Sequence, residues 1–142
     1  MFDPPAEGEK RNLGAVSTAE WTGVPVRQVF ARAGVLKRAR EVLFRDAVEG
    51  RADPIHFERS LRIDDPNLDE ALLAYAMNGE VLSVPHGFPL RLVVPGWYAV
   101  TSIKWLTEIA LIEGPFRGFF QADRYLCEQA ALSTSEARGD QP

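Results

Sequence analysis

The spacing of apolar residues predicts one helix in the first third of the chain. Apolar side chains recur there at positions i, i+3, i+4 and i+7: Val26, Val29, Phe30 and Ala33. This spacing places them on one face of a helix. Pro25 suits the first turn of such a helix, and Gly34 suits its end. The pattern therefore predicts a helix over residues 25–35.

After this segment the pattern changes to short β-rich runs: Glu41–Phe44, Leu61–Ile63 and Leu90–Val94. The run 72–77 also suits a helix by propensity, but Asn78-Gly79 between apolar residues is the strongest short hairpin signal. We therefore predict that Leu73–Met77 pairs with Val81–Val84 across a type I′ turn. Trp105–Ile112 is expected to form a helical turn followed by a strand. These elements predict an α+β fold in which strands dominate the second half.

Length and composition indicate one folded domain. The chain has 142 residues, 46% of them apolar and 25% charged, as in average globular proteins. We expect the domain to span 13–128, because 1–12 and 129–142 are polar and rich in small or charged residues, and we expect these ends to be disordered.

Charge and the absence of long apolar runs restrict the partners and the compartment. The net charge of −4 argues against a nucleic-acid partner. No run is long enough for a signal peptide or a membrane span. A cytoplasmic protein is expected from the chain as encoded, and a periplasmic one only if an upstream signal precedes it.

One stretch differs electrostatically from the rest of the chain. Residues 81–107 contain no Asp or Glu, and their charged groups are Arg91 and Lys104, with His86 as a further possible cation. Cationic groups without a local counter-ion suit a buried anion site. The alternative is that buried strands simply lack acids, with Arg91 and Lys104 paired to distant carboxylates such as Glu108 or Glu113.

The motifs in and around this stretch indicate a family. The run 78–98 (NGEVLSVPHGFPLRLVVPGWY) closely resembles the motif of the sulfite-oxidase-type, molybdopterin-binding oxidoreductases, and Ser102–Leu106 follows at the family's spacing. Gly14–Pro25 resembles the segment before the family's first helix, and Phe119–Tyr125 resembles its closing aromatic–Gln–Asp–Tyr element. The resemblance covers about residues 13–125.

This resemblance implies a mixed β-sheet domain that binds molybdopterin, the molybdenum cofactor, and acts on a small oxyanion or oxide. It implies that the pterin and its phosphate are held by two short segments, with these residues: His86, Arg91, Ser102, Ile103 and Lys104. Tyr125 matches the active-site tyrosine that assists the oxyanion chemistry. Among the other aromatic residues, core packing is expected for Trp97, Trp105 and Phe88, and Tyr75 is expected to be buried at its ring.

The sequence departs from the family at the metal ligand. In the family a cysteine of an upstream C-x-G-N-type motif gives its thiolate to molybdenum, but residues 1–13 contain no cysteine and Cys127 lies at the wrong end of the pattern. We therefore assign no metal ligand and expect a domain that is incomplete on its N-terminal side. Two other functions stay open: a catalytically inactive cofactor- or anion-binding module, and a fragment that needs a redox partner or a chain supplying the cysteine.

Overall fold

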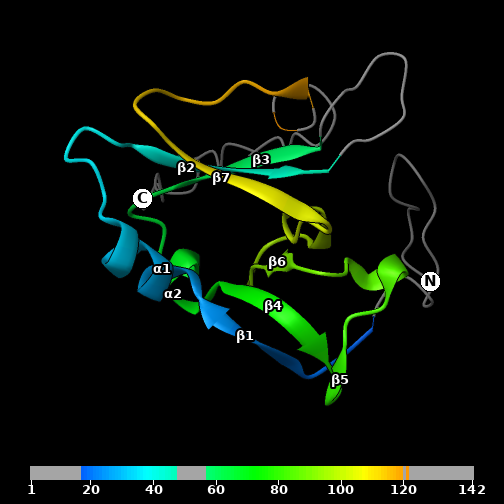
Figure 1. Ribbon diagram of the computed structural model, residues 1–142. Helices are drawn as coiled ribbons and strands as arrows, with labels where there is room; N and C mark the ends of the chain where they lie inside the picture. The colour runs from blue at the N-terminus through cyan, green and yellow to red at the C-terminus, as the bar shows by residue number, and fades with distance from the viewer. Residues whose placement is uncertain (1–16, 48–56, 120, 122–142) are drawn as a thin grey trace, which may run out of the picture.

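Two antiparallel sheets face each other in the computed structural model, which describes residues 17–47, 57–119 and 121 (Figure 1). One sheet has the order β1-β4-β5, with β6 also pairing with β4; its strands are β1 (Trp21–Pro25), β4 (Leu72–Met77), β5 (Glu80–Val81) and β6 (Arg91–Val93). The other has the order β3-β2-β7; its strands are β2 (Glu41–Asp46), β3 (Glu58–Arg62) and β7 (Leu106–Ile112). All these pairs are antiparallel. The α+β class is confirmed.

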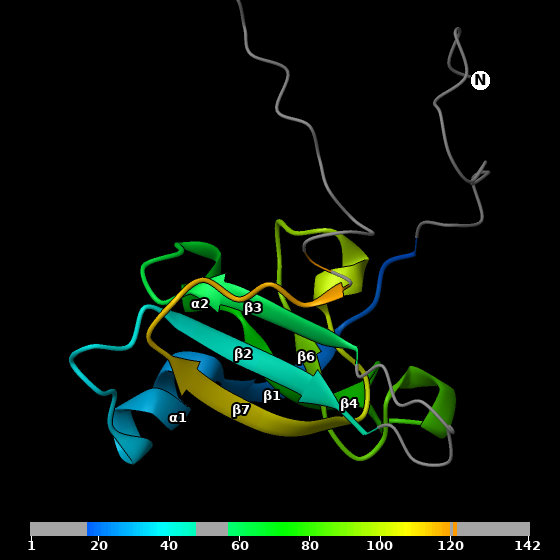
Figure 2. The same ribbon diagram turned by 90° about the horizontal axis from the view of Figure 1, so that it is seen from above.

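Two helices lie together at one end of the sheets, as both views show (Figures 1 and 2). Helix α1 spans Val26–Ala33 and ends at Gly34, whose φ of 82° favours glycine. Helix α2 spans Asn67–Glu70 and follows Pro66. The prediction of a helix over 25–35 is confirmed, with its ends drawn in by one residue at the start and two at the finish.

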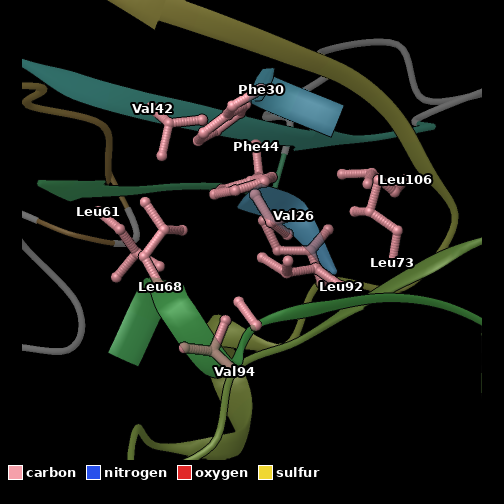
Figure 3. Close-up of a cluster of buried hydrophobic side chains, with 12 residues drawn as sticks. Val26, Phe30, Val42, Phe44, Leu61, Leu68, Leu73, Leu92, Val94 and Leu106 are labelled. Atoms are coloured by element: carbon pink, nitrogen blue, oxygen red, sulfur yellow. The ribbon is translucent and has the colours of Figure 1, made fainter. Parts of the chain in front are cut away.

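The hydrophobic core lies between the sheets and is closed by the helices (Figure 3). It takes side chains from both layers: Val26, Phe30, Val42, Phe44, Leu61, Leu68, Ala71, Leu73, Leu92, Val94, Ile103 and Leu106. Val26, Phe44 and Leu92 are fully buried, although they come from a helix and from two different sheets. Each layer therefore buries the apolar face of the other, which stabilises both.

The predicted hairpin is confirmed between β4 and β5. Asn78 has φ 54° and Gly79 has φ 79°, which are the positive angles that a type I′ turn requires. Strand β5 is shorter than predicted, because residues Val84–His86 form a 3₁₀ turn instead of extending it.

Replacing Gly79 with valine should lower the free energy of unfolding by roughly 1–3 kcal/mol. No atom lies within 4 Å of a Cβ placed there, so the cost comes from the positive φ alone. Gly114→Val is the matched control, since it has equally open surroundings and no positive φ. Equal urea midpoints for the two variants would contradict the I′ turn.

Four expectations about aromatic residues and one about a helical turn are wrong. Trp105 has φ 51° and leads directly into β7, so no helical turn begins at Trp105, and the 3₁₀ turn before this strand ends at Thr101. Phe88, Trp97 and Trp105 are 47%, 44% and 37% exposed, and Tyr75 is 48% exposed on β4. The reason is their position, because Tyr75 lies on the outer face of β4 and the other three lie in loops on the surface.

The segment after β7 is tied back to the edge of β3. The side chain of Gln121 accepts a hydrogen bond from Ser60 N (2.8 Å) and donates one to Ser60 Oγ (2.9 Å). Glu41 in turn accepts from Ser60 Oγ (2.6 Å) and from Phe116 N (3.0 Å). The side chain of Gln121 thus satisfies one backbone N–H of the edge strand β3.

Within the described ranges, no helix has the length and apolar character needed to cross a membrane.

Candidate functional site

The turn that carries His86 is held by hydrogen bonds to each of its carbonyl oxygens. Pro85 O accepts from Lys104 Nζ at 2.7 Å, and His86 O accepts from Arg91 Nη1 at 3.0 Å. Val84 O accepts from Gly87 N and from Trp105 Nε1, and Ser83 O accepts from the His86 and Phe88 amides. Three side chains from outside the turn therefore fix the backbone on which His86 is mounted.

Arg91 begins β6 and lies beneath this turn with 8% of its surface exposed. Its Nη2 donates to Ser102 O at 3.3 Å, and its guanidinium lies 4.6 Å from the centre of the Trp21 ring. Burial lowers the pKa of the Arg91 guanidinium from its ordinary value. Its Nε is buried without a hydrogen-bond partner in the described part of the chain. A buried charged donor left unpaired is costly, so this site lacks an acceptor.

Lys104 approaches the same turn from the segment before β7. Its Nζ donates to Pro85 O and lies 5.8 Å from the centre of the Trp105 ring. Gly87, with φ 106°, lets the two segments meet, because a Cβ there would come within 3.0 Å of Lys104 Cβ and 3.1 Å of Arg91 Cβ. The glycine is required for this close approach.

Ser102 and Ile103 act through their backbone and through one hydroxyl. Ser102 Oγ accepts from Val94 N at 3.0 Å, and Ile103 O accepts from Leu92 N at 2.7 Å. Ile103 itself is 1% exposed and belongs to the core. These bonds join the segment before β7 to β6, so the predicted cofactor-binding residues lie in one place.

The imidazole of His86 is exposed, and its Nδ1 lies 2.7 Å from Ser83 Oγ. The hydroxyl occupies Nδ1 and leaves Nε2 as the ring nitrogen open to a ligand. Sequence reasoning missed Ser83, whose position three residues before His86 in a turn is the signal that could have found it. It also assigned no role to Trp21.

The alternative ion pairs for Arg91 and Lys104 are wrong. Glu108 pairs with Arg45, and Glu113 pairs with Arg38. In the ranges described, Arg91 and Lys104 are held by carbonyl oxygens and aromatic rings and by no carboxylate. Such partners hold a cation but do not cancel its charge. The cation cluster (His86, Arg91 and Lys104) therefore fits an anionic group such as a phosphate.

The predicted catalytic Tyr125 lies outside the described residues, and so does Cys127. The expected segments 1–12 and 129–142 also lie wholly outside the described residues, and parts of 13–128 do as well. Over the described ranges, no group of three or more His, Cys, Asp or Glu side chains could hold a metal ion.

Residues 2–120 match the model of a known family, the oxidoreductase molybdopterin binding domain. The chain belongs to this family. The resemblance of the sequence to sulfite-oxidase-type proteins is thus confirmed, and molybdopterin is the cofactor of this domain.

Individual relatives of this molybdopterin-binding domain agree with the family match. This chain is 40% identical to sulfite oxidase of Gallus gallus over 115 residues, which cover 75% of this chain and 24% of that protein. It is 38% identical to nitrate reductase [NADH] 1 of Phaseolus vulgaris over 106 residues, 69% of this chain and 12% of that protein.

Among solved structures, the sulfane dehydrogenase SoxCD from Paracoccus pantotrophus matches with a TM-score of 0.66 and 30% identity. The match covers 75% of this chain and 26% of that one. The domain therefore spans about a quarter or less of the length of these three proteins.

Proposed function

We propose that the cation cluster binds the phosphate of molybdopterin and that the domain serves an oxidoreductase acting on a small oxyanion or oxide. One observation carries this proposal: three cationic or potentially cationic side chains converge on one turn, in a stretch without acids, and two of them are held by groups that leave their charge uncancelled. An anion completes such a site, and the family supplies an anionic cofactor.

Each residue has a distinct part in this binding. Lys104 supplies a point charge that can turn from Pro85 O to a phosphate oxygen, and His86 offers Nε2 as a donor when it carries a proton there. Arg91 links the His86 turn to the segment before β7 through its bonds to His86 O and Ser102 O, and its Nε has no acceptor among the described residues. Ser102 and Ile103 fix the segment that carries Lys104 against β6. When bound, molybdopterin supplies the metal-centred redox chemistry.

The substrate and the remaining ligands are also proposals. Cations near the cofactor attract a small oxyanion or the oxygen of an oxide by Coulomb forces. Tyr125, which matches the family's active-site tyrosine, would donate its hydroxyl hydrogen to that oxyanion. Cys127 is the one cysteine among the 142 residues and lies at the wrong end of the pattern. We therefore propose that a thiolate for molybdenum comes from a residue outside this sequence, on the same chain or on a partner chain.

Lys104→Gln should weaken binding of inorganic phosphate and of isolated molybdopterin about tenfold or more, because a charge-assisted hydrogen bond of roughly 1.5–3 kcal/mol is lost. Titration calorimetry on the 142-residue chain would measure both affinities. Lys37→Gln is the matched control, since Lys37 is exposed and lies in the loop between α1 and β2. A wild-type chain that binds neither probe would overturn the proposed function, as would equal affinities for the two variants.

A further inference from the structure

Arg91 is held differently from the arginines of the described ranges that form the ion pairs named next. These arginines pair with carboxylates: Arg27 with Asp69, Arg38 with Glu113, Arg45 with Glu58 and Glu108, and Arg62 with Asp64. Arg91 instead lies against the Trp21 ring at 4.6 Å, although it is far more buried than these surface pairs. A buried charge is the case in which a carboxylate partner is most expected.

The contact between Trp21 and Arg91 is formed across the width of the sheet. Trp21 begins β1, Arg91 begins β6, and β4 pairs with both strands. The start of β1 is fixed by the hairpin turn, because Asn78 Oδ1 accepts from Glu20 N at 2.9 Å and Asn78 N donates to Glu20 O at 2.8 Å. The backbone directly before Trp21 is therefore fixed by the hairpin turn.

An aromatic ring and a carboxylate have opposite consequences for a ligand. The ring face attracts a guanidinium through its quadrupole and carries no net charge, so the positive field of Arg91 persists beyond it. A carboxylate at the same place would cancel that field and occupy the donors that a phosphate needs.

We propose that Trp21 is a positioning residue of the cation cluster: its ring orients the Arg91 guanidinium beneath the His86 turn and leaves the charge available to the anionic cofactor. This inference rests on the proposed function of the cluster, and it adds a residue from another strand.

Three substitutions test it on the 142-residue chain, with inorganic phosphate as the probe and calorimetry as the measurement. Trp21→Phe keeps an aromatic face and should bind within about threefold of wild type. Trp21→Leu keeps apolar bulk alone and should bind about three- to tenfold more weakly. Trp21→Glu should bind about tenfold or more weakly, because the new carboxylate pairs with Arg91.

Val24→Glu is the charge-matched control, since it adds the same charge on β1 at a residue that is 40% exposed. Thermal melts of all variants show which of them are folded, and if Trp21→Glu does not fold, the comparison of Trp21→Phe with Trp21→Leu decides. Equal affinities of Phe and Leu variants would overturn the inference, as would equal affinities of Trp21→Glu and Val24→Glu. If the wild-type chain binds no inorganic phosphate, the same comparisons are made with isolated molybdopterin. A wild-type chain that binds neither probe would overturn the proposed function instead, so the two failures are distinguishable.

Discussion

Gly23→Ala should lower the free energy of unfolding by about 3 kcal/mol or more, which is large for the addition of one methyl group. A Cβ at this position would lie 2.4 Å from Leu73 O and 2.8 Å from the Ala74 Cα. Both are backbone atoms of β4, with which β1 pairs here, so a side-chain rotation cannot relieve the clash. The strand would have to leave the sheet at its irregular register between Thr22 and Gly23.

A urea melt of Gly23→Ala measures this loss, with Gly114→Ala as the control because nothing lies within 4 Å of a Cβ there. A difference below about 0.5 kcal/mol, the usual range for surface substitutions, would show that β1 does not pair with β4 as described.

Arg91→Ala should reduce the affinity for phosphate and for molybdopterin about ten- to a hundredfold and should also destabilise the domain. The ligand loses a charge-assisted donor worth roughly 1.5–3 kcal/mol. The fold loses the bonds to His86 O and Ser102 O, which join the turn to the segment before β7. Binding and stability should therefore fall together.

Arg91→Lys separates the two effects. A lysine keeps the positive charge but has no planar fork that can reach two carbonyl oxygens and stack on Trp21. We expect it to retain more phosphate affinity than Arg91→Ala and to remain less stable than wild type. Titration calorimetry and urea melts on the same samples check both statements, and an Arg91→Ala chain with wild-type affinity would remove Arg91 from the site.

The parts of the fold that the sequence predicts are those with local causes. Helix α1 follows from apolar spacing between Pro25 and Gly34, and the β4–β5 hairpin follows from Asn78-Gly79. Both signals act over a few residues, so they can be recognised without knowledge of the rest of the fold. The acid-free stretch likewise indicated the cation cluster, because a charge pattern is visible without knowledge of the fold.

What the sequence could not predict depends on segments that meet only in the folded chain. The exposure of Trp105 follows from its positive φ and its bond to Val84 O, and neither has a signal in the residues around it. The contact of Trp21 with Arg91 requires that β1 and β6 pair with the same strand. The pairing of Gln121 with Ser60 spans 61 positions and rests on one amide side chain.

The segment from β6 to β7 passes from one sheet to the other, and it carries Lys104, one of the three residues of the cation cluster. Leu92 N donates to Ile103 O, and Leu106 N donates to Leu90 O. These two hydrogen bonds hold the connecting segment against β6 and the residue before it, near the site. An anion bound by both segments would add a further link between the two sheets. Binding of the cofactor and folding of the domain are then linked. A ligand at a hundred times its Kd adds about 2.7 kcal/mol to the free energy of unfolding. In a cell, the supply of molybdopterin would thus set how long this domain escapes proteolysis, as well as how much of it is loaded.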